Sequence, residues 1–327
     1  MGLKSIMSEI EEDVNDITNT DFVYNDTETV PPSDDSGLSY EKNKEKKGKE
    51  LTSCVLYVDI RNSVLLTEKH SSKVMGKIYT AFTKGVIKAA RHHGGHTRNI
   101  IGDRVMIVFP QEKCFTNAIR CAISINHVAK IINEKFKGVD FKCGIGIDHG
   151  KMQITKVGVP RKGKENQPNR GLVWAGIPAN IASRLTDMGN KKITRTMYEL
   201  NVKSILSDYF SQSQPYRLNT PTGKYQFPAS TYLYQPKPLS VTESEFLSGV
   251  KIENGISFFR SRQVISLKKN VEEYTYPAIL LTEQVYKGLI NEGLEPNLYL
   301  PGDWTEQKLA IRNVKGKVYG GSYTWKL

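Results

Sequence analysis

The chain has 327 residues, of which 39% are hydrophobic and 24% charged, as in a globular protein with one substantial core and room for an insertion or a second small domain. No apolar run approaches the roughly 18 residues that a membrane span needs, and the first residues lack the pattern of a signal peptide, so we expect a cytoplasmic protein with no membrane partner. The net charge of +12 suits a nucleoside triphosphate as well as a nucleic acid.

The first 50 residues differ in composition from the rest. Residues 1–41 are acidic, residues 42–49 (KNKEKKGK) are rich in lysine, and apolar periodicity is weak after Ile17. This composition predicts a disordered leader over residues 1–50, within which SEIEEDVNDI can form a short amphipathic helix. A solvated tail and a regulatory or partner-binding segment both fit the pattern.

From Leu51 onward the pattern becomes that of a folded domain. Apolar periodicity predicts in turn a buried strand, a helix, a hairpin, a second helix and a strand pair, over residues 54–60, 74–93, 96–109, 114–136 and 141–158. The order βαββαββ predicts an α+β fold. We expect an antiparallel or mixed sheet with two helices packed on one face, the ferredoxin-like plan.

The cysteines and histidines of this region invite other readings. The cysteines lie in apolar segments without the close pairs of a redox motif or a zinc site, which predicts reduced core thiols at Cys54, Cys114, Cys121 and Cys143. Three histidines flank Gly94 and Gly95. These are His92, His93 and His96. They fit either a metal site or the C-terminal end of a helix, where histidine interacts favourably with the helix dipole.

Two aspartates stand where predicted strands end or turn. Asp59 closes the first strand, and Asp103 lies with Gly102 in the tight turn of the hairpin. If the two side chains converge, the backbone carbonyl of Ile60 adds a third oxygen. Such oxygens suit two magnesium or manganese ions that activate an attacking oxygen and neutralise a leaving diphosphate. Each aspartate alone also fits an ordinary turn or cap.

Four motifs together resemble the catalytic domain of the class III nucleotide cyclases, over roughly residues 51–192. They are DIRNS, GGHTRNIIGD, GIGIDHGKM and NIASR. The resemblance implies that Asp59, Ile60 and Asp103 hold the metals, that Asn180 orients the ribose and that Arg184 stabilises the transferring phosphate. Residues four apart share one helical face, so the last two can act together. The resemblance also implies a homodimer whose active sites are shared between the subunits.

The family ends in a Val-Lys-Gly-Lys hairpin, which residues 314–317 match. Lys315 is therefore the expected triphosphate ligand, and residues 276–327 are expected to complete the domain. Residues 193–275 are then an insertion of unknown role. The segment ITRTMYEL offers a competing alignment, which we disfavour because only the later copy continues into VKGK and a closing strand.

The base-reading positions depart from those of purine cyclases. Asn99 and Val173 replace the charged and polar purine readers, and Tyr57 shares a strand face with Asp59. These departures resemble the pyrimidine cyclases of the bacterial Pycsar anti-phage system, which implies cyclic CMP or cyclic UMP as product, CTP as favoured substrate, and a separate effector that responds to the cyclic nucleotide. An adenylyl cyclase, an inactive cyclase-like binding module and a basic nucleic-acid binder are the alternatives. The last lacks RNA-recognition strand signatures, so nucleic acid is not the expected primary ligand.

Overall fold

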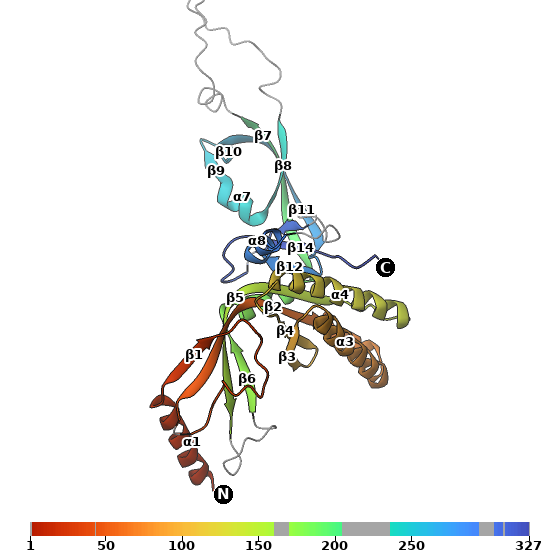
Figure 1. Ribbon diagram of the computed structural model, residues 1–327. Coiled ribbons are helices and arrows are strands. Elements are labelled where there is room, and N and C mark those ends of the chain that lie inside the picture. Colours follow the sequence, from red (N-terminus) through yellow and green to blue (C-terminus); the bar gives the residue numbers. More distant parts are fainter. Residues whose placement is uncertain are drawn as a thin grey trace, which may run out of the picture. The chain divides into compact units, whose positions relative to one another are not determined.

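The computed structural model describes residues 2–42, 44–159, 170–204, 236–293, 304–309 and 311–326. The chain forms two compact units (Figure 1). Unit 1 comprises Met1–Lys191 and Tyr276–Leu327, and unit 2 comprises Lys192–Thr275. No helix in the described parts of the chain is both long and apolar enough to cross a membrane.

Unit 1 is built on a ferredoxin-like sheet. Its central strands run in the order β5-β2-β4-β3, and each neighbouring pair is antiparallel; they are β5 (Cys143–Gly158), β2 (Lys46–Ile60), β4 (Arg104–Val108) and β3 (His96–Ile101). With a helix after the first and third strands in chain order, this arrangement confirms the predicted α+β plan. The predicted strand pair over residues 141–158 is wrong, because β5 is one long strand, and it pairs with β6 (Arg170–Ala175).

The helices cover both faces of this sheet. On one face α3 (Ser72–His92) and α4 (Cys114–Lys135) pack together as predicted, after the short α2 (Ser63–Lys69). On the other face lies α5 (Ile177–Thr186). The alternation of side chains along β2 divides the core accordingly: Leu56 and Val58 join the α3 and α4 side, whereas Val55 joins the α5 side.

The histidines and cysteines of this core follow the simpler of their two readings. Helix α3 ends at His92, and His93 is its C-terminal cap, whose backbone N–H is bonded to the last turn. All four cysteines are buried and free. Among the described residues, no group of three His, Cys, Asp or Glu side chains could hold a metal ion.

The C-terminal segment returns to the sheet of unit 1. Strand β12 (Ile279–Thr282) pairs in parallel with β5, leads into α8 (Glu283–Asn291), and is joined on its other edge by β14 (Val318–Gly321). Strand β13 (Thr305–Gln307) pairs with β14. The later of the two competing alignments is therefore the one found in the fold, since ITRTMYEL belongs to a strand of unit 2.

The prediction of a disordered leader is wrong for the described residues. Helix α1 (Leu3–Thr18) is followed by β1 (Phe22–Asp26), which pairs in parallel with the start of β2. The acidic and lysine-rich segments neutralise one another: Lys49 bonds Asp35 at 2.6 Å, and the nearly fully buried Lys46 bonds Asp16 at 3.0 Å. Composition counted these charges as solvated, although they pair across the sequence.

Unit 2 is a five-stranded sheet of order β8-β7-β11-β10-β9 with one short helix. Its elements are β7 (Lys192–Ser204), β8 (Lys237–Thr242), α7 (Glu243–Gly249), β9 (Val250–Glu253), β10 (Ile256–Phe259) and β11 (Arg262–Thr275). It has a small core of its own, formed by Leu200, Val202, Val241 and Phe259. The unit thus folds around separate apolar contacts, in the stretch for which the sequence predicts an insertion.

Candidate active site

The centre of the candidate site is Asp59, at the end of β2. Arg104, the first residue of β4, donates to Asp59 Oδ2 from Nη2 at 2.6 Å and from Nε at 3.2 Å. Val58 pairs with Val105 in the antiparallel ladder of β2 and β4. The next residues along the two strands, Asp59 and Arg104, therefore lie opposite each other. Asp103, partly buried in the turn before Arg104, lies at the same end of the two strands. The strand end and the turn are thus adjacent, and the convergence of the two carboxylates stays a prediction.

Arg104 also ties this strand end to α5. Its guanidinium donates to Ser183 Oγ at 2.8 Å and forms an ion pair with Asp187. Burial lowers the pKa of Arg104, but its hydrogen bonds with Asp59 and Asp187 outweigh this, so that the net shift is upward. The cation is therefore permanent, and it holds β2, β4 and α5 together at the site.

Arg61 and Thr186 fix the C-terminal end of α5 beside β2. Arg61 donates to the backbone carbonyl oxygens of Thr186 and, at 3.1 Å, of Asp187, where a helix end attracts positive charge. Thr186 Oγ1 lies 3.0 Å from the carbonyl oxygen of Tyr57, to which it donates. These contacts give the helix that carries Asn180 and Arg184 a defined place relative to Asp59.

The glycines of the GIGID segment permit this close approach. A Cβ at Gly146 would overlap the carbonyl oxygen of Ala182 in α5. We expect Gly146→Ala to push α5 outward, to cost about 1 to 3 kcal/mol of unfolding free energy and to reduce cyclase activity. Thermal denaturation and initial rates measure both effects. Gly171→Ala in β6 is the matched control, because nothing lies within 4 Å of its Cβ position; equal stability of both variants and the parent would contradict the prediction.

The phosphate-binding candidates lie on α5 and on the loop that precedes β14. Arg184 Nη1 donates at 2.7 Å to the carbonyl oxygen of Arg312, in the loop that leads to Lys315. In that loop Gly316 has φ +91°, and the N–H of Lys317 donates at 3.0 Å to Glu283. Lys315 is exposed and lines an open hollow of about 590 Å³ beside α8. Asn180 is exposed one turn before Arg184.

Within one chain the two groups remain separate. Among the described residues, no hydrogen bond or ion pair joins the aspartates to the phosphate-binding candidates, the residues in question being Asp59, Asp103, Asn180, Arg184 and Lys315. In the description below, the aspartates form one half-site and the phosphate-binding candidates form the other.

The base-pocket candidates lie on three strands: Tyr57 and Asn99 both pair with Met106 of β4, whereas Val173 lies on β6. Tyr57 is half-buried on the α5 side of β2, and burial, opposed by the charge of Arg104, raises the pKa of its phenol. Asn99 is exposed on β3, and Val173 is 46% exposed on β6. No described contact unites the three, so their role in reading a base is a prediction that needs a second subunit or a substrate.

The donor set at the strand end suits divalent cations. The oxygen ligands would come from Asp59, Asp103 and the backbone carbonyl of Ile60. Magnesium is commonly bound by one or two carboxylates, with substrate phosphates and water as its other ligands. Arg104 shares the carboxylate of Asp59 with any such ion. Since Asp187 and Ser183 also hold Arg104, its guanidinium keeps two partners when Asp59 turns to a metal.

Sequence reasoning missed Arg104, Asp187 and Ser183. Arg104 adjoins the Gly-Asp motif, Ser183 lies within the Asn-x-x-x-Arg motif, and Asp187 follows that motif by three residues. In the sequence, Asp187 looks like an ordinary surface residue at the end of a helix. Only the approach of α5 to β4 gives these residues a common partner.

Comparison with known proteins finds similar nucleotide cyclases. No family model matches the chain. A uridylate cyclase from Burkholderia cepacia is 30% identical over 182 residues, covering 53% of this chain and 74% of that protein. A uridylate cyclase from Rhodovulum sp. (strain MB263) is 26% identical over 200 residues, covering 58% and 78%. The adenylyl cyclase CyaB from P. aeruginosa gives a TM-score of 0.48 at 13% identity, with 84% of this chain and 94% of that one covered.

The fold and the strand-end aspartates define a nucleotide cyclase domain. The chain belongs to the class III nucleotide cyclase family, and it is a nucleotidyl cyclase. Within that family it is most like the pyrimidine cyclases of the Pycsar system, as its motifs indicate.

Proposed function

We propose that the protein converts a pyrimidine nucleoside triphosphate to a 3′,5′-cyclic nucleotide and diphosphate. The observation that carries the proposal is the junction of Asp59 and Asp103 at one end of β2 and β4, tied through Arg104 to the helix that bears Asn180 and Arg184. Of the two pyrimidine bases, uracil gains support because the relatives are named uridylate cyclases. Cytosine is the choice that the sequence favours.

The proposed reaction is attack of the ribose 3′-oxygen on the α-phosphorus, with cleavage of the bond to the diphosphate and loss of the hydroxyl proton to solvent. Two magnesium or manganese ions, when bound, supply the acidity that activates the hydroxyl and charge that stabilises the diphosphate. Asp59, Asp103 and the Ile60 carbonyl would hold them. Asn180 orients the ribose, Arg184 binds the transferring phosphoryl oxygens, and Lys315 binds the terminal phosphates, all as fixed donors.

We further propose that the two half-sites close only in a homodimer. Arg184 contacts the loop that leads to Lys315, whereas its neighbour Ser183 contacts Arg104. A twofold axis can place Arg184 and Lys315 against the aspartates of the partner subunit, which produces two equal sites per dimer. A monomer is then inactive. A role in cytoplasmic anti-phage signalling through a separate effector belongs to the same proposal, on the strength of the Pycsar resemblance.

Base choice is tested with the four nucleoside triphosphates. We expect turnover of UTP or CTP to exceed that of ATP and GTP, because Asn99 and Val173 offer no charged purine reader. Asn99→Lys should lower pyrimidine turnover by about tenfold or more, since a mismatched hydrogen-bond partner costs several kcal/mol of discrimination. Initial rates with product identification by mass spectrometry measure both. Ile100→Lys, at the neighbouring exposed position, controls for added charge on this hairpin.

Two outcomes separate the parts of this proposal. A parent enzyme that prefers ATP by tenfold, about 1.4 kcal/mol, would overturn the pyrimidine assignment and make the protein an adenylyl cyclase. If none of the four triphosphates gives a cyclic product with both magnesium and manganese present, the protein is an inactive cyclase-like binding module.

A further inference from the structure

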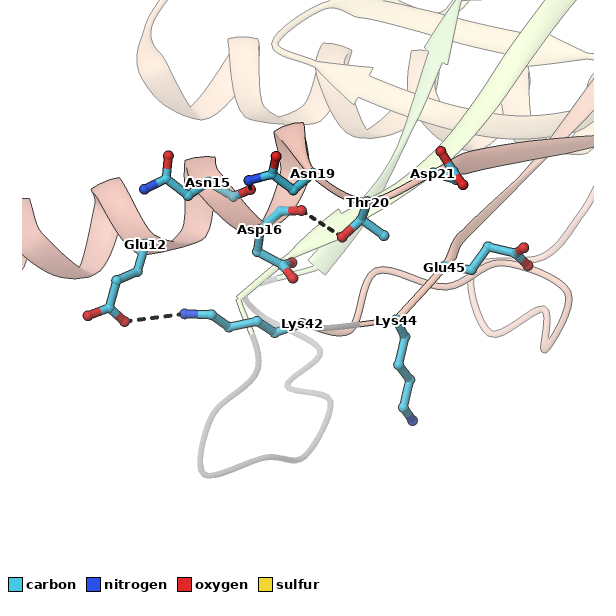
Figure 2. Close-up of a pocket in the computed structure, with 9 residues that line it drawn as sticks. All are labelled: Glu12, Asn15, Asp16, Asn19, Thr20, Asp21, Lys42, Lys44 and Glu45. Atoms are coloured by element: carbon cyan, nitrogen blue, oxygen red, sulfur yellow. Dashed lines mark hydrogen bonds and ion pairs between the residues drawn. The ribbon is translucent and has the colours of Figure 1, made fainter.

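Helix α1 is attached to its own chain through its polar side. Lys42 pairs with Glu12 at 3.5 Å (Figure 2) and with Asp13 at 3.1 Å, and the buried Lys46 pairs with Asp16. Lys46 also donates to the backbone carbonyls of Glu41 and Lys44, so it is fully engaged. The space between helix and loop is an open polar hollow of about 750 Å³. The acidic side of α1 thus faces inward.

The apolar side of α1 is consequently uncovered. None of its residues is buried, and its large apolar side chains are 39% to 73% exposed: Leu3, Ile6, Met7, Ile10, Val14 and Ile17. A helix of a globular protein ordinarily turns such a stripe toward the core. Here the ion pairs with Lys42 and Lys46 hold it in the opposite orientation, which leaves the stripe for another molecule.

The spacing of the stripe is that of a coiled-coil seam. Leu3, Met7, Ile10, Val14 and Ile17 follow one another at intervals of four, three, four and three residues. This alternation keeps apolar side chains along one line when two helices supercoil, with Met7 and Val14 at the a positions and the others at d. A seam of this kind is complementary to itself, so the simplest partner is the same helix of a second copy.

The charges of α1 agree with a second copy and argue against a lipid surface. The helix has one lysine and five acidic residues, so an anionic membrane would repel it. In a parallel pair, the residues that flank the seam bring Ile6 against Glu11 and Asp13 against Thr18, which puts no like charges together. An antiparallel pair would place Glu11 against its own copy.

We propose that α1 forms a short parallel two-stranded coiled coil with α1 of a second copy, clamping the cyclase dimer at its N-terminal end. Sixteen residues are too few for a stable isolated coiled coil, but a helix already formed and tethered to a dimer pairs at high effective concentration. The inference rests on the proposed dimer and adds an interface outside the catalytic site.

Disulfide trapping tests the geometry. Ile17→Cys places a thiol on the seam near one end of α1, where it meets its own copy only if the two helices are parallel. Under mild oxidation we expect a covalent dimer within minutes. Ser5→Cys, on the polar side of the same helix and opposite the seam, is the matched control and should remain monomeric on a non-reducing gel. The four native cysteines are buried, so their background should be low.

Sedimentation velocity supplies an independent measurement. The double variant Ile10→Asp/Val14→Asp should raise the dimer dissociation constant at least tenfold, whereas Ser5→Asp/Ser8→Asp, which adds the same charge off the seam, should change it less than twofold. Circular dichroism checks that α1 remains helical. No trapped dimer from Ile17→Cys together with an unchanged dissociation constant would overturn the inference, as would binding of α1 to anionic vesicles.

Both readouts are taken without substrate. They therefore test the interface independently of the reaction. If the protein is an active cyclase but Ile17→Cys forms no disulfide-linked dimer, only the coiled-coil proposal is rejected. If the dimer is trapped but the protein has no cyclase activity, only the proposed function is rejected.

Discussion

Asp59→Ala is expected to lower cyclisation by about three orders of magnitude or more, because it removes a carboxylate that would hold a divalent ion worth several kcal/mol of transition-state stabilisation. Asp103→Ala should have a similar effect. The protein should remain folded, since Arg104 retains Asp187 and Ser183 when Asp59 is lost. Initial rates over a manganese titration, with thermal denaturation on the same samples, measure loss of activity and of stability separately.

Asp140→Ala is the control for this prediction. Asp140 is an acidic residue whose side chain is 80% exposed and pairs only locally, with Lys142 at 3.1 Å. It should leave activity and stability close to those of the parent. An Asp59→Ala enzyme with activity near that of the parent in saturating manganese would remove Asp59 from the metal site, whatever the fold.

The central fold was predictable because its signals are local. The apolar alternation of β2, the two long amphipathic helices and the Gly102 turn together specify the strand order of a ferredoxin-like sheet. Residues 1–50 were misread for the opposite reason. Their order depends on pairs such as Lys49 with Asp35, and on Tyr24 packing over Gly48, where a Cβ would overlap its ring. Composition does not contain such pairings.

The site shows the same division between local and distant information. Asp59, Asp103, Asn180 and Arg184 stand in short motifs, and their proposed roles come from those motifs. Arg104 was not found from a motif, because its function in the structure is to join a strand to a helix almost eighty residues later in the chain. The base-pocket role of Tyr57, Asn99 and Val173 stays a prediction, because it concerns contacts with a base that single-chain contacts do not include.

Mixing two inactive variants should restore activity, and this is the sharpest test of the shared site. In a heterodimer of Asp59→Ala and Arg184→Ala subunits, one site combines both lesions and the other combines neither. Random exchange makes about half of the dimers mixed, so about a quarter of the parent activity should return.

Asp59→Ala mixed with Asp103→Ala is the matched control. Both lesions fall in the metal-binding half of the site, so every site keeps one lesion and no activity should appear. Subunit exchange is verified by native mass spectrometry. If heterodimers form in both mixtures and both stay inactive, the shared site is wrong and each subunit must complete its own site.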